Sequence, residues 1–293
     1  MAHTPSAQAG PGAAAATASR SGPPPRFAPE ILEFYNRGLE DGRLRQGVER
    51  LELWRTQDIL RRVLPSPGAG GDIGTGCRLL DVGGGPGIHA EWLAADGWSV
   101  ELIDPVPSHV EQAATLPGVT ARLGDARALH RDDASADVVL LLGPLYHLPD
   151  PEDRHRALTE AARAVRPGGL VAVATINRHA ALHDQLNRGG WFDPARRRRI
   201  AATSATGLVG ADGAFTTAYL HDPAAIAEEI AAAGLTVAGQ YGVEGAAWLM
   251  DGVAARLDDE EARAAVLEAL RITESDPALL GVSSHVLTIA RRD

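Results

Sequence analysis

The feature that most constrains this chain is a run of glycines that directly follows a short apolar segment. Residues 79–87 read Leu-Leu-Asp-Val-Gly-Gly-Gly-Pro-Gly. The apolar run 79–82 is typical of a buried strand, and residues 88–95 have a helical pattern that Gly97 ends. Glycine allows a positive φ and a close approach of the backbone to a ligand. The sequence therefore predicts a strand, a tight ligand-binding turn and a helix.

Strand and helix patterns alternate along most of the remaining chain. Asp150-Pro151 and Asp222-Pro223 are typical of an N-cap followed by the first helical residue, and Ser108 and Glu111 have capping-box spacing. Pro167-Gly168-Gly169 is expected to end the helix before the fifth strand. This alternation predicts an α/β fold with a doubly wound, seven-stranded, mostly parallel sheet. The seven strands are expected at residues 79–82, 100–103, 120–123, 137–142, 170–176, 235–241 and 285–290.

The chain is expected to consist of a disordered tail and one domain. Residues 1–26 are rich in alanine, serine, glycine and proline and cannot bury enough apolar surface to fold. Residues 27–293 are expected to form the domain. Its predicted parts are a helical arm and linker (27–76), a cofactor-binding core (77–177), a lid insertion after the fifth strand (178–221) and the C-terminal part of the sheet (222–293).

The glycine spacing argues against two common nucleotide sites. The third glycine of a dinucleotide fingerprint, counted from Gly83, would fall at Ile88. Pro86 removes a backbone N–H that a pyrophosphate would use, and no Gly-Lys-Ser/Thr follows to complete a P-loop. A zwitterionic amino acid needs fewer such donors, and the nearby carboxylate of Asp81 can meet its ammonium group.

Five motifs together resemble one family. Residues 81–87 resemble motif I of the class I methyltransferases that depend on S-adenosylmethionine (SAM), and Asp104 matches that family's acidic ligand of the ribose hydroxyls. Residues 124–126 resemble its adenine-edge motif, residues 141–144 its strand-four motif, and residues 166–169 the turn before strand five. The resemblance extends motif by motif over about residues 78–174 and implies the class I methyltransferase fold.

The resemblance implies SAM as cofactor and a set of residues that bind it. Asp81 could instead cap the following helix, Asp104 could be a turn residue before Pro105, and Asp125 could form an Asx-turn. The implied cofactor-binding residues are Asp81, Gly83, Gly85, Gly87, Asp104, Asp125, Ala126 and Leu142.

Methyl transfer from a sulfonium is an in-line displacement, so the protein supplies positioning and, for a weak nucleophile, a base. Histidine accepts protons near neutral pH. We expect His147, after the fourth strand, or His179, after the fifth, to line the acceptor pocket as the catalytic residue; His183 and His221 are further candidates.

Two subclasses of the family are disfavoured. Residues 143–146 lack the Asn/Asp-Pro-Pro-Tyr/Phe sequence of enzymes that methylate planar amide or exocyclic nitrogens. Leu142 and Asn177 stand where metal-dependent catechol-type enzymes carry carboxylates, so no metal is expected.

The acceptor pocket is expected to draw on the arm, the loop after strand four and the lid. The region 180–219 is too long for an ordinary loop and is rich in aromatic residues for a chain with few of them. These rings could also merely anchor the lid. Arg43 and Arg55 of the arm are expected beside the pocket, whose candidate residues are Tyr35, Tyr146, Trp191 and Tyr219.

Charge and composition restrict the partners. The net charge of −10 disfavours nucleic acid, and the basic run 196–199 is interpreted as a solvated helix face. A single cysteine, Cys77, fits a reducing compartment, and a cytoplasmic protein without a membrane segment is expected. The favoured interpretation is methylation of a small molecule, with oxygen slightly ahead of nitrogen or carbon. The alternatives are a protein or RNA methyltransferase and a SAM-binding protein that does not methylate, such as a sensor or a recruited cyclase.

Overall fold

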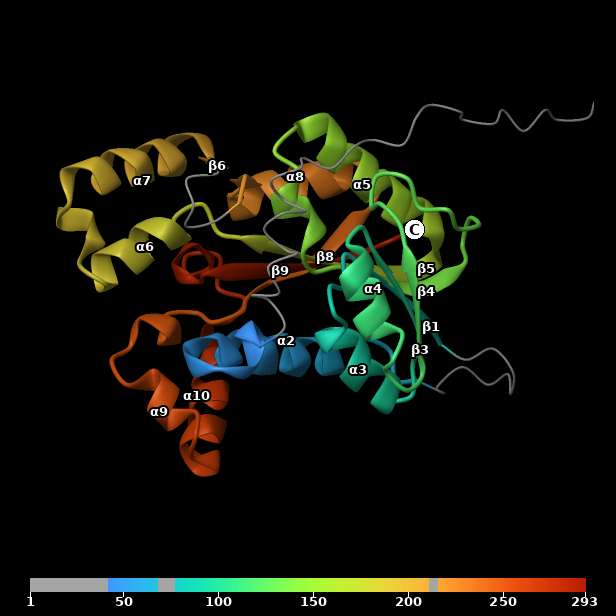
Figure 1. Ribbon diagram of the computed structural model, residues 1–293, viewed down its shortest axis with the longest axis horizontal. Helices are drawn as coiled ribbons and strands as arrows, with labels where there is room; N and C mark the ends of the chain where they lie inside the picture. Colours follow the sequence, from blue (N-terminus) through green and yellow to red (C-terminus); the bar gives the residue numbers. More distant parts are fainter. Residues whose placement is uncertain (1–41, 68–76, 211–215) are drawn as a thin grey trace, which may run out of the picture.

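The computed structural model describes residues 42–67, 77–210 and 216–293, and over these residues the chain forms a seven-stranded sheet between helices (Figure 1). Strands β1 to β5 are parallel, and β9 lies antiparallel between β5 and β8. The predicted doubly wound, mostly parallel sheet is therefore confirmed. Its spatial order is β3 (Val119–Leu123), β2 (Ser99–Asp104), β1 (Arg78–Val82), β4 (Ala136–Leu141), β5 (Val165–Ile176), β9 (His285–Arg291) and β8 (Thr236–Gly242).

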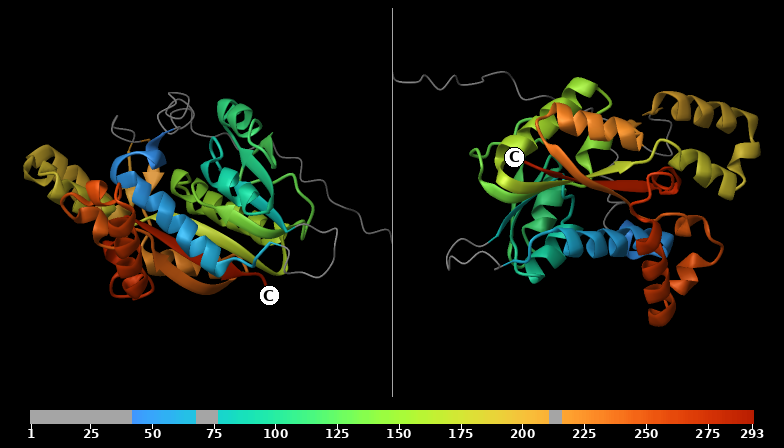
Figure 2. Two further views of the ribbon diagram at one scale, coloured as in Figure 1. Left: turned by 90° about the horizontal axis from the view of Figure 1, so that it is seen from below. Right: turned by 180° about the vertical axis from the view of Figure 1, so that it is seen from behind.

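Alternate side chains of each strand face two different helical layers. Leu80 and Val139 belong to the core shared with α5 and α8, whereas Leu79 and Val138 face α2 and α3. Figure 1 shows α5 and α8 above the sheet and α2 and α3 below it, and the view from behind in Figure 2 agrees. These layers comprise α2 (Arg50–Val63), α3 (Ile88–Ala95), α4 (Pro107–Ala113), α5 (Pro151–Ala164) and α8 (Pro223–Ala232).

The local signals at the helix ends were correct in part. Asp150 and Asp222 accept hydrogen bonds from the first turns of α5 and α8, as predicted. The predicted capping box is wrong, because α4 already begins at Pro107 and the carboxylate of Asp104 takes the N–H of Val106. Residues 167–169 do not end the preceding helix, as was predicted, because α5 ends at residue 164 and these residues already lie within β5.

The N-terminal arm packs against the C-terminal part of the chain. It consists of the short 3-10 helices η1 (Arg43–Arg45) and η2 (Gly47–Glu49), followed by α2. The fully buried guanidinium of Arg55 donates to the carbonyl of Val243 at 3.0 Å and to Glu274 at 2.6 Å. Residues 27–41 of the predicted arm lie outside the described residues. The partners of α2 include α9 (Val253–Arg256) and α10 (Glu260–Thr273).

A helical hairpin follows β5 and projects from the domain at the upper left of Figure 1. It has two helices, α6 (Ala180–Asn187) and α7 (Pro194–Thr206), joined by η4 (Gly190–Phe192), and α7 buries none of its residues. The short strands β6 (Leu208–Val209) and β7 (Ala218–Tyr219) pair at its base. The remaining 3-10 helices are η3 (Pro144–His147), η5 (Ala247–Leu249) and η6 (Leu280–Val282).

No helix in the described part of the chain combines the length and the apolarity needed to cross a bilayer.

Candidate functional site

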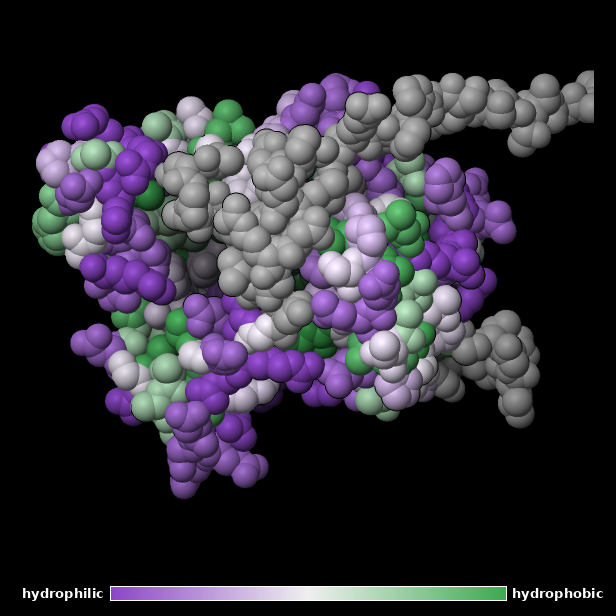
Figure 3. Space-filling model, in the orientation of Figure 1, coloured by the Kyte–Doolittle hydropathy of each residue, from purple (hydrophilic) through white to green (hydrophobic). Residues whose placement is uncertain are grey.

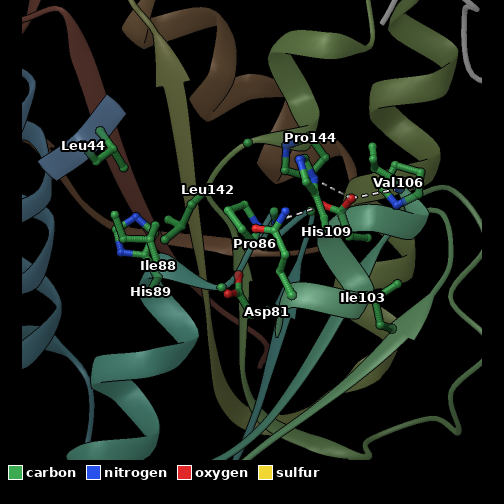
Figure 4. Close-up of a pocket in the computed structure, with 18 of the residues that line it drawn as sticks. Leu44, Asp81, Pro86, Ile88, His89, Ile103, Val106, His109, Leu142 and Pro144 are labelled. Carbon is green, nitrogen blue, oxygen red and sulfur yellow. Dashed lines mark hydrogen bonds and ion pairs between the residues drawn. The ribbon is translucent and has the colours of Figure 1, made fainter. Parts of the chain in front are cut away.

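A cavity of about 680 Å³ opens at the carboxyl ends of the parallel strands. Gly83, Asp104, Gly124 and Leu142, which follow or end β1, β2, β3 and β4, all line it. Ligands of doubly wound sheets bind at this edge, where the strand order reverses. Here the reversal lies between β1 and β4, and the cavity volume is ordinary for a small-molecule site, which is roughly 300–1,000 Å³. Figure 4 shows the residues that converge on it.

The glycines of the loop after β1 serve different purposes. Gly83, Gly85 and Gly87 all have a left-handed backbone, with φ of +70°, +58° and +96°. A Cβ at Gly87 would lie 2.5 Å from the Leu116 side chain, so this glycine permits close packing. A Cβ at Gly85 would meet nothing nearer than His109 at 4.0 Å and would project into the cavity. Gly85 therefore leaves room for a ligand to lie on the backbone.

Asp104 is fixed at the cavity wall by three donors. The N–H groups of Gly85 and Val106 donate to its two carboxylate oxygens, each at 2.9 Å. The Nδ1 atom of His109, a buried residue of α4, lies 3.1 Å from Oδ1. A carboxylate can accept about four hydrogen bonds, so Asp104 keeps capacity for a ligand hydroxyl.

Asp81 brings a second carboxylate beneath the glycine loop. It is buried, and its Oδ2 makes no hydrogen bond within the described residues. Burial, with a smaller contribution from the charge of Asp104, raises the pKa of Asp81 to about 7. A buried carboxylate oxygen without a hydrogen bond destabilises the fold until a hydrogen-bond donor reaches it.

These features fit SAM. The unsatisfied oxygen of Asp81 suits the ammonium group of the cofactor's amino acid, and Asp104 suits the ribose hydroxyls. Ile103, Gly124 and Ala126 line the cavity beyond Asp104, where an apolar surface suits a planar base.

The implied cofactor residues do not all face the cavity. Asp81, Asp104, Ala126, Leu142 and the three glycines line it. Asp125 is absent from the lining, because its carboxylate accepts hydrogen bonds from the backbone and guanidinium of Arg127 at 2.8–3.0 Å. The Asx-turn alternative describes this geometry, and adenine recognition by Asp125 stays a prediction.

The loop after β4 contributes Tyr146 and His147 to the lining. Their rings meet edge to face, with centroids 4.6 Å apart. His147 is buried, and burial lowers its pKa to about 4, so the imidazole is neutral at physiological pH. A neutral imidazole beside the cavity can orient a hydroxyl group.

The other residues proposed for catalysis and the acceptor pocket lie elsewhere. His179 is exposed at the start of α6, and Trp191 is half-buried in η4. Tyr219 packs beneath the guanidinium of Arg154, which lies 4.0 Å from its ring centroid. None of the three belongs to the described lining of the cavity, and Tyr35 lies outside the described residues. The role of 178–221 as a lid stays a prediction.

Several charged or polar side chains that were not predicted as ligands also line the cavity, and three of them bear on its chemistry. Glu52 and His89 line one end, and His109 lines the other. Arg43, which was expected beside the pocket, also lines it, whereas Arg55 is engaged with residues of the C-terminal part. Position along a helix gives no signal for Glu52, since the cavity depends on how α2 packs on strands far away in the sequence.

Comparison with known proteins gives a consistent result. Residues 39–238 match a family described as "Methyltransferase domain". An uncharacterized methyltransferase of Mycobacterium tuberculosis is 37% identical over 128 residues, which cover 41% of this chain and 50% of that protein. A ubiquinone biosynthesis O-methyltransferase of Maricaulis maris is 37% identical over 109 residues, covering 35% and 42%. The chain thus spans about half the length of the curated relatives it matches.

The fold also matches solved structures. A SAM-dependent methyltransferase of Thermotoga maritima, described as a possible histamine N-methyltransferase, aligns with a TM-score of 0.53 at 17% identity. The alignment covers 92% of this chain and the whole of that one. At this identity the likeness concerns the fold and not the acceptor.

Proposed function

The chain belongs to the methyltransferase-domain family, whose cofactor is SAM, and from this premise we propose that it methylates a small-molecule acceptor. Oxygen is favoured over nitrogen or carbon as the acceptor atom. The similarity to a ubiquinone biosynthesis O-methyltransferase, which extends over about a third of the chain, supports this preference. Residues 27–293 are proposed to act as one domain.

The observation that carries the proposal is the cavity itself. Its Asp104 end presents the carboxylate, the open glycine backbone and the apolar wall that suit a nucleoside. Its other end is walled by η1 and by Glu52 of α2, so space remains beyond the glycine loop. A walled site of this size suits a small acceptor better than a macromolecular chain.

The residues of the chain supply position and desolvation. SAM, when bound, supplies a methyl group activated by the sulfonium charge. Asp104 and the Gly85 backbone fix the nucleoside, which sets the direction from which an acceptor can approach. Leu142 and Pro144 exclude water from the wall formed by the loop after β4. His147 is proposed to orient the acceptor, and its neutral state suits hydrogen bonding to a hydroxyl.

The surface offers little support for a nucleic-acid substrate. The basic run 196–199 lies on α7, and Figure 3 shows hydrophilic side chains over this projecting hairpin. None of these arginines lines the cavity, and the chain carries a net charge of −10.

The proposal is tested by supplying SAM with a labelled methyl group to the pure protein and a lysate of the native host. The lysate is separated into small-molecule, protein and RNA fractions before counting. We expect label in the small-molecule fraction that disappears with Asp104→Ala. Asp132→Ala is the matched control, because Asp132 is exposed and lies outside the cavity lining.

The other outcomes contradict the proposal in distinct ways. Label in protein or RNA would favour a macromolecular methyltransferase. SAM binding without label in any fraction would favour a protein that binds SAM and does not methylate.

A further inference from the structure

A chain of alternating charges lies at the end of the cavity that holds His89 and Leu44 in Figure 4. Glu52 of α2 lines the cavity there and is close enough to His89 to influence its protonation. Its Oε2 lies 2.9 Å from Nη1 of Arg43 and 3.9 Å from Nδ1 of His285. The Glu52 carboxylate thus stands between two cations and beside the cavity.

His285 is in turn held from behind by Glu244. The Oε1 atom of Glu244 lies 2.6 Å from Nδ1 of His285, and its Oε2 accepts from the hydroxyl of Ser283 and the N–H of His285. Burial alone would lower the pKa of His285, but the two carboxylates raise it to about 9. Burial likewise favours the neutral acid of Glu52, yet His285 and Arg43 hold its pKa below the usual value. The group is therefore two carboxylates compensated by two cations at neutral pH.

The topology places this group at the same edge of the sheet as the glycine loop. His285 is the first residue of β9 and pairs with Ile176, the last residue of β5. Glu244 follows the end of β8 by two residues. Both therefore lie at the sheet edge that carries the glycine loop, and Glu52 connects them to the cavity.

We propose that Glu52, held by His285 and Glu244, forms the acceptor subsite and selects a neutral hydroxyl group. The proposal deepens the proposed function and rests on it. An acceptor ammonium would add a third cation beside Arg43 and His285, and an acceptor carboxylate would be repelled by Glu52. On binding, a neutral O–H donates one hydrogen bond to Glu52 and adds no charge to the group.

Glu52, Glu244 and His285 have potential metal-ligand atoms within 4.8 Å of one another, so a divalent cation is the alternative ligand of this group. The Nδ1 atom of His285 faces Glu244 at 2.6 Å, and because the pKa of His285 is raised to about 9, the ring is protonated at neutral pH. A metal would have to displace that proton, and Arg43 already compensates Glu52. The charges therefore favour an organic hydroxyl.

The resulting step is balanced within the site. The hydroxyl oxygen supplies the electron pair of the new O–CH3 bond, and the electron pair of the broken S–CH3 bond stays with sulfur. The hydroxyl proton passes to the Glu52 carboxylate and from there to solvent. The products are a methyl ether and the neutral thioether of the cofactor.

The test uses full-length protein, labelled SAM and the small-molecule fraction of a native-host lysate. Glu52→Gln should lower the labelling rate by about 100-fold or more, because general-base catalysis contributes about 10²–10⁴-fold. Its dissociation constant for SAM, measured by calorimetry, should stay within about threefold of the original. Glu49→Gln, the same charge change three residues earlier and outside the cavity lining, should label at the original rate. The labelled product should be an ether that resists mild alkali.

Each contrary result identifies what fails. Labelling at the original rate by Glu52→Gln, or a parallel loss of SAM affinity, would overturn the acceptor subsite and leave the proposed function standing. An alkali-labile ester, a methylamine, or labelling abolished by EDTA and restored by Mn²⁺ would also overturn it. No label with the unmodified protein would be a failure of the proposed function. If Glu52→Gln does not fold, Glu244→Gln replaces it, with an expected reduction of about tenfold at unchanged SAM affinity.

Discussion

Replacing Asp81 by asparagine should make the ligand-free protein more stable and SAM binding weaker. The carboxylate is buried beneath the glycine loop, and its Oδ2 lacks a hydrogen bond within the described residues. Asparagine has the same shape and carries no charge, so the change removes the penalty of the buried charge without creating a cavity.

The pKa of Asp81 sets the size and the sign of the effect. The folded chain holds its proton up to a pH of about 7, whereas an unperturbed carboxyl loses it near 3.8. Between these values only the folded state binds the proton, so this group lowers the free energy of unfolding as the pH rises. At about 1.36 kcal/mol per pH unit, the penalty reaches about 4 kcal/mol above pH 7, and solvent relaxation makes this an upper bound.

Urea unfolding of both proteins at pH 4.5, 6 and 8 measures this penalty. The stability advantage of Asp81→Asn should be small at the lowest pH and grow by about 2–4 kcal/mol towards pH 8. Comparing the two proteins cancels the other titrating groups. Saturating SAM should reduce the advantage, because the variant binds the cofactor less tightly. An advantage that is independent of pH, or a variant less stable at pH 8, would refute the assignment of Asp81 as a strained ligand carboxylate.

Three further predictions concern other parts of the molecule. Arg55→Met should lower the free energy of unfolding by about 3–5 kcal/mol in urea titrations, because it removes a fully buried partner of Glu274. The Arg62 side chain is partly exposed, so Arg62→Met should lower it by less than about 1 kcal/mol, and equal losses would contradict the argument. Gly87→Ala combines a left-handed backbone with a Cβ contact of 2.5 Å, so calorimetry should show weaker SAM binding and thermal unfolding a stability lower by about 2 kcal/mol or more. An alanine variant with unchanged affinity would show that the loop adapts. His147→Ala should slow methyl transfer by about tenfold or more, whereas His179→Ala should stay within about twofold, since of these two histidines only His147 lines the cavity. Turnover within about twofold after replacing both would exclude a catalytic role for either.

The cofactor end of the site was predictable because its signals are local. The glycine loop, its strand and its helix occupy residues 78–95, and Asp104 ends the next strand. Periodicity and turn chemistry report such units directly. The same local signals gave a wrong prediction at Ser108, because the carboxylate of Asp104 accepts the hydrogen bond of the Val106 N–H at the start of α4.

The end of the cavity that we assign to the acceptor could not be predicted because its parts are far apart in the sequence. Glu52 lies on α2 and its partner His285 on β9, and the hydrogen bond from Arg55 to Glu274 spans 219 positions. No periodicity within α2 indicates which of its polar residues will face a cavity. Asp125 shows the converse limit, since its motif fits the family while its carboxylate is held by Arg127.

The packing of α2 on the C-terminal part of the chain has a consequence for synthesis on the ribosome. Arg55 finds its partners Val243 and Glu274 only 188 and 219 residues later. At about 5–20 residues per second, Arg55 therefore waits roughly 10–40 s after its own translation before both partners have been made. The glycine loop, its strand and the packing of α2 on α3 can form during that interval, so the contacts between α2 and the C-terminal part form last. A chain that stops before β9 would keep Glu52 and Arg43 and would lack His285, the second cation of the subsite that we assign to the acceptor.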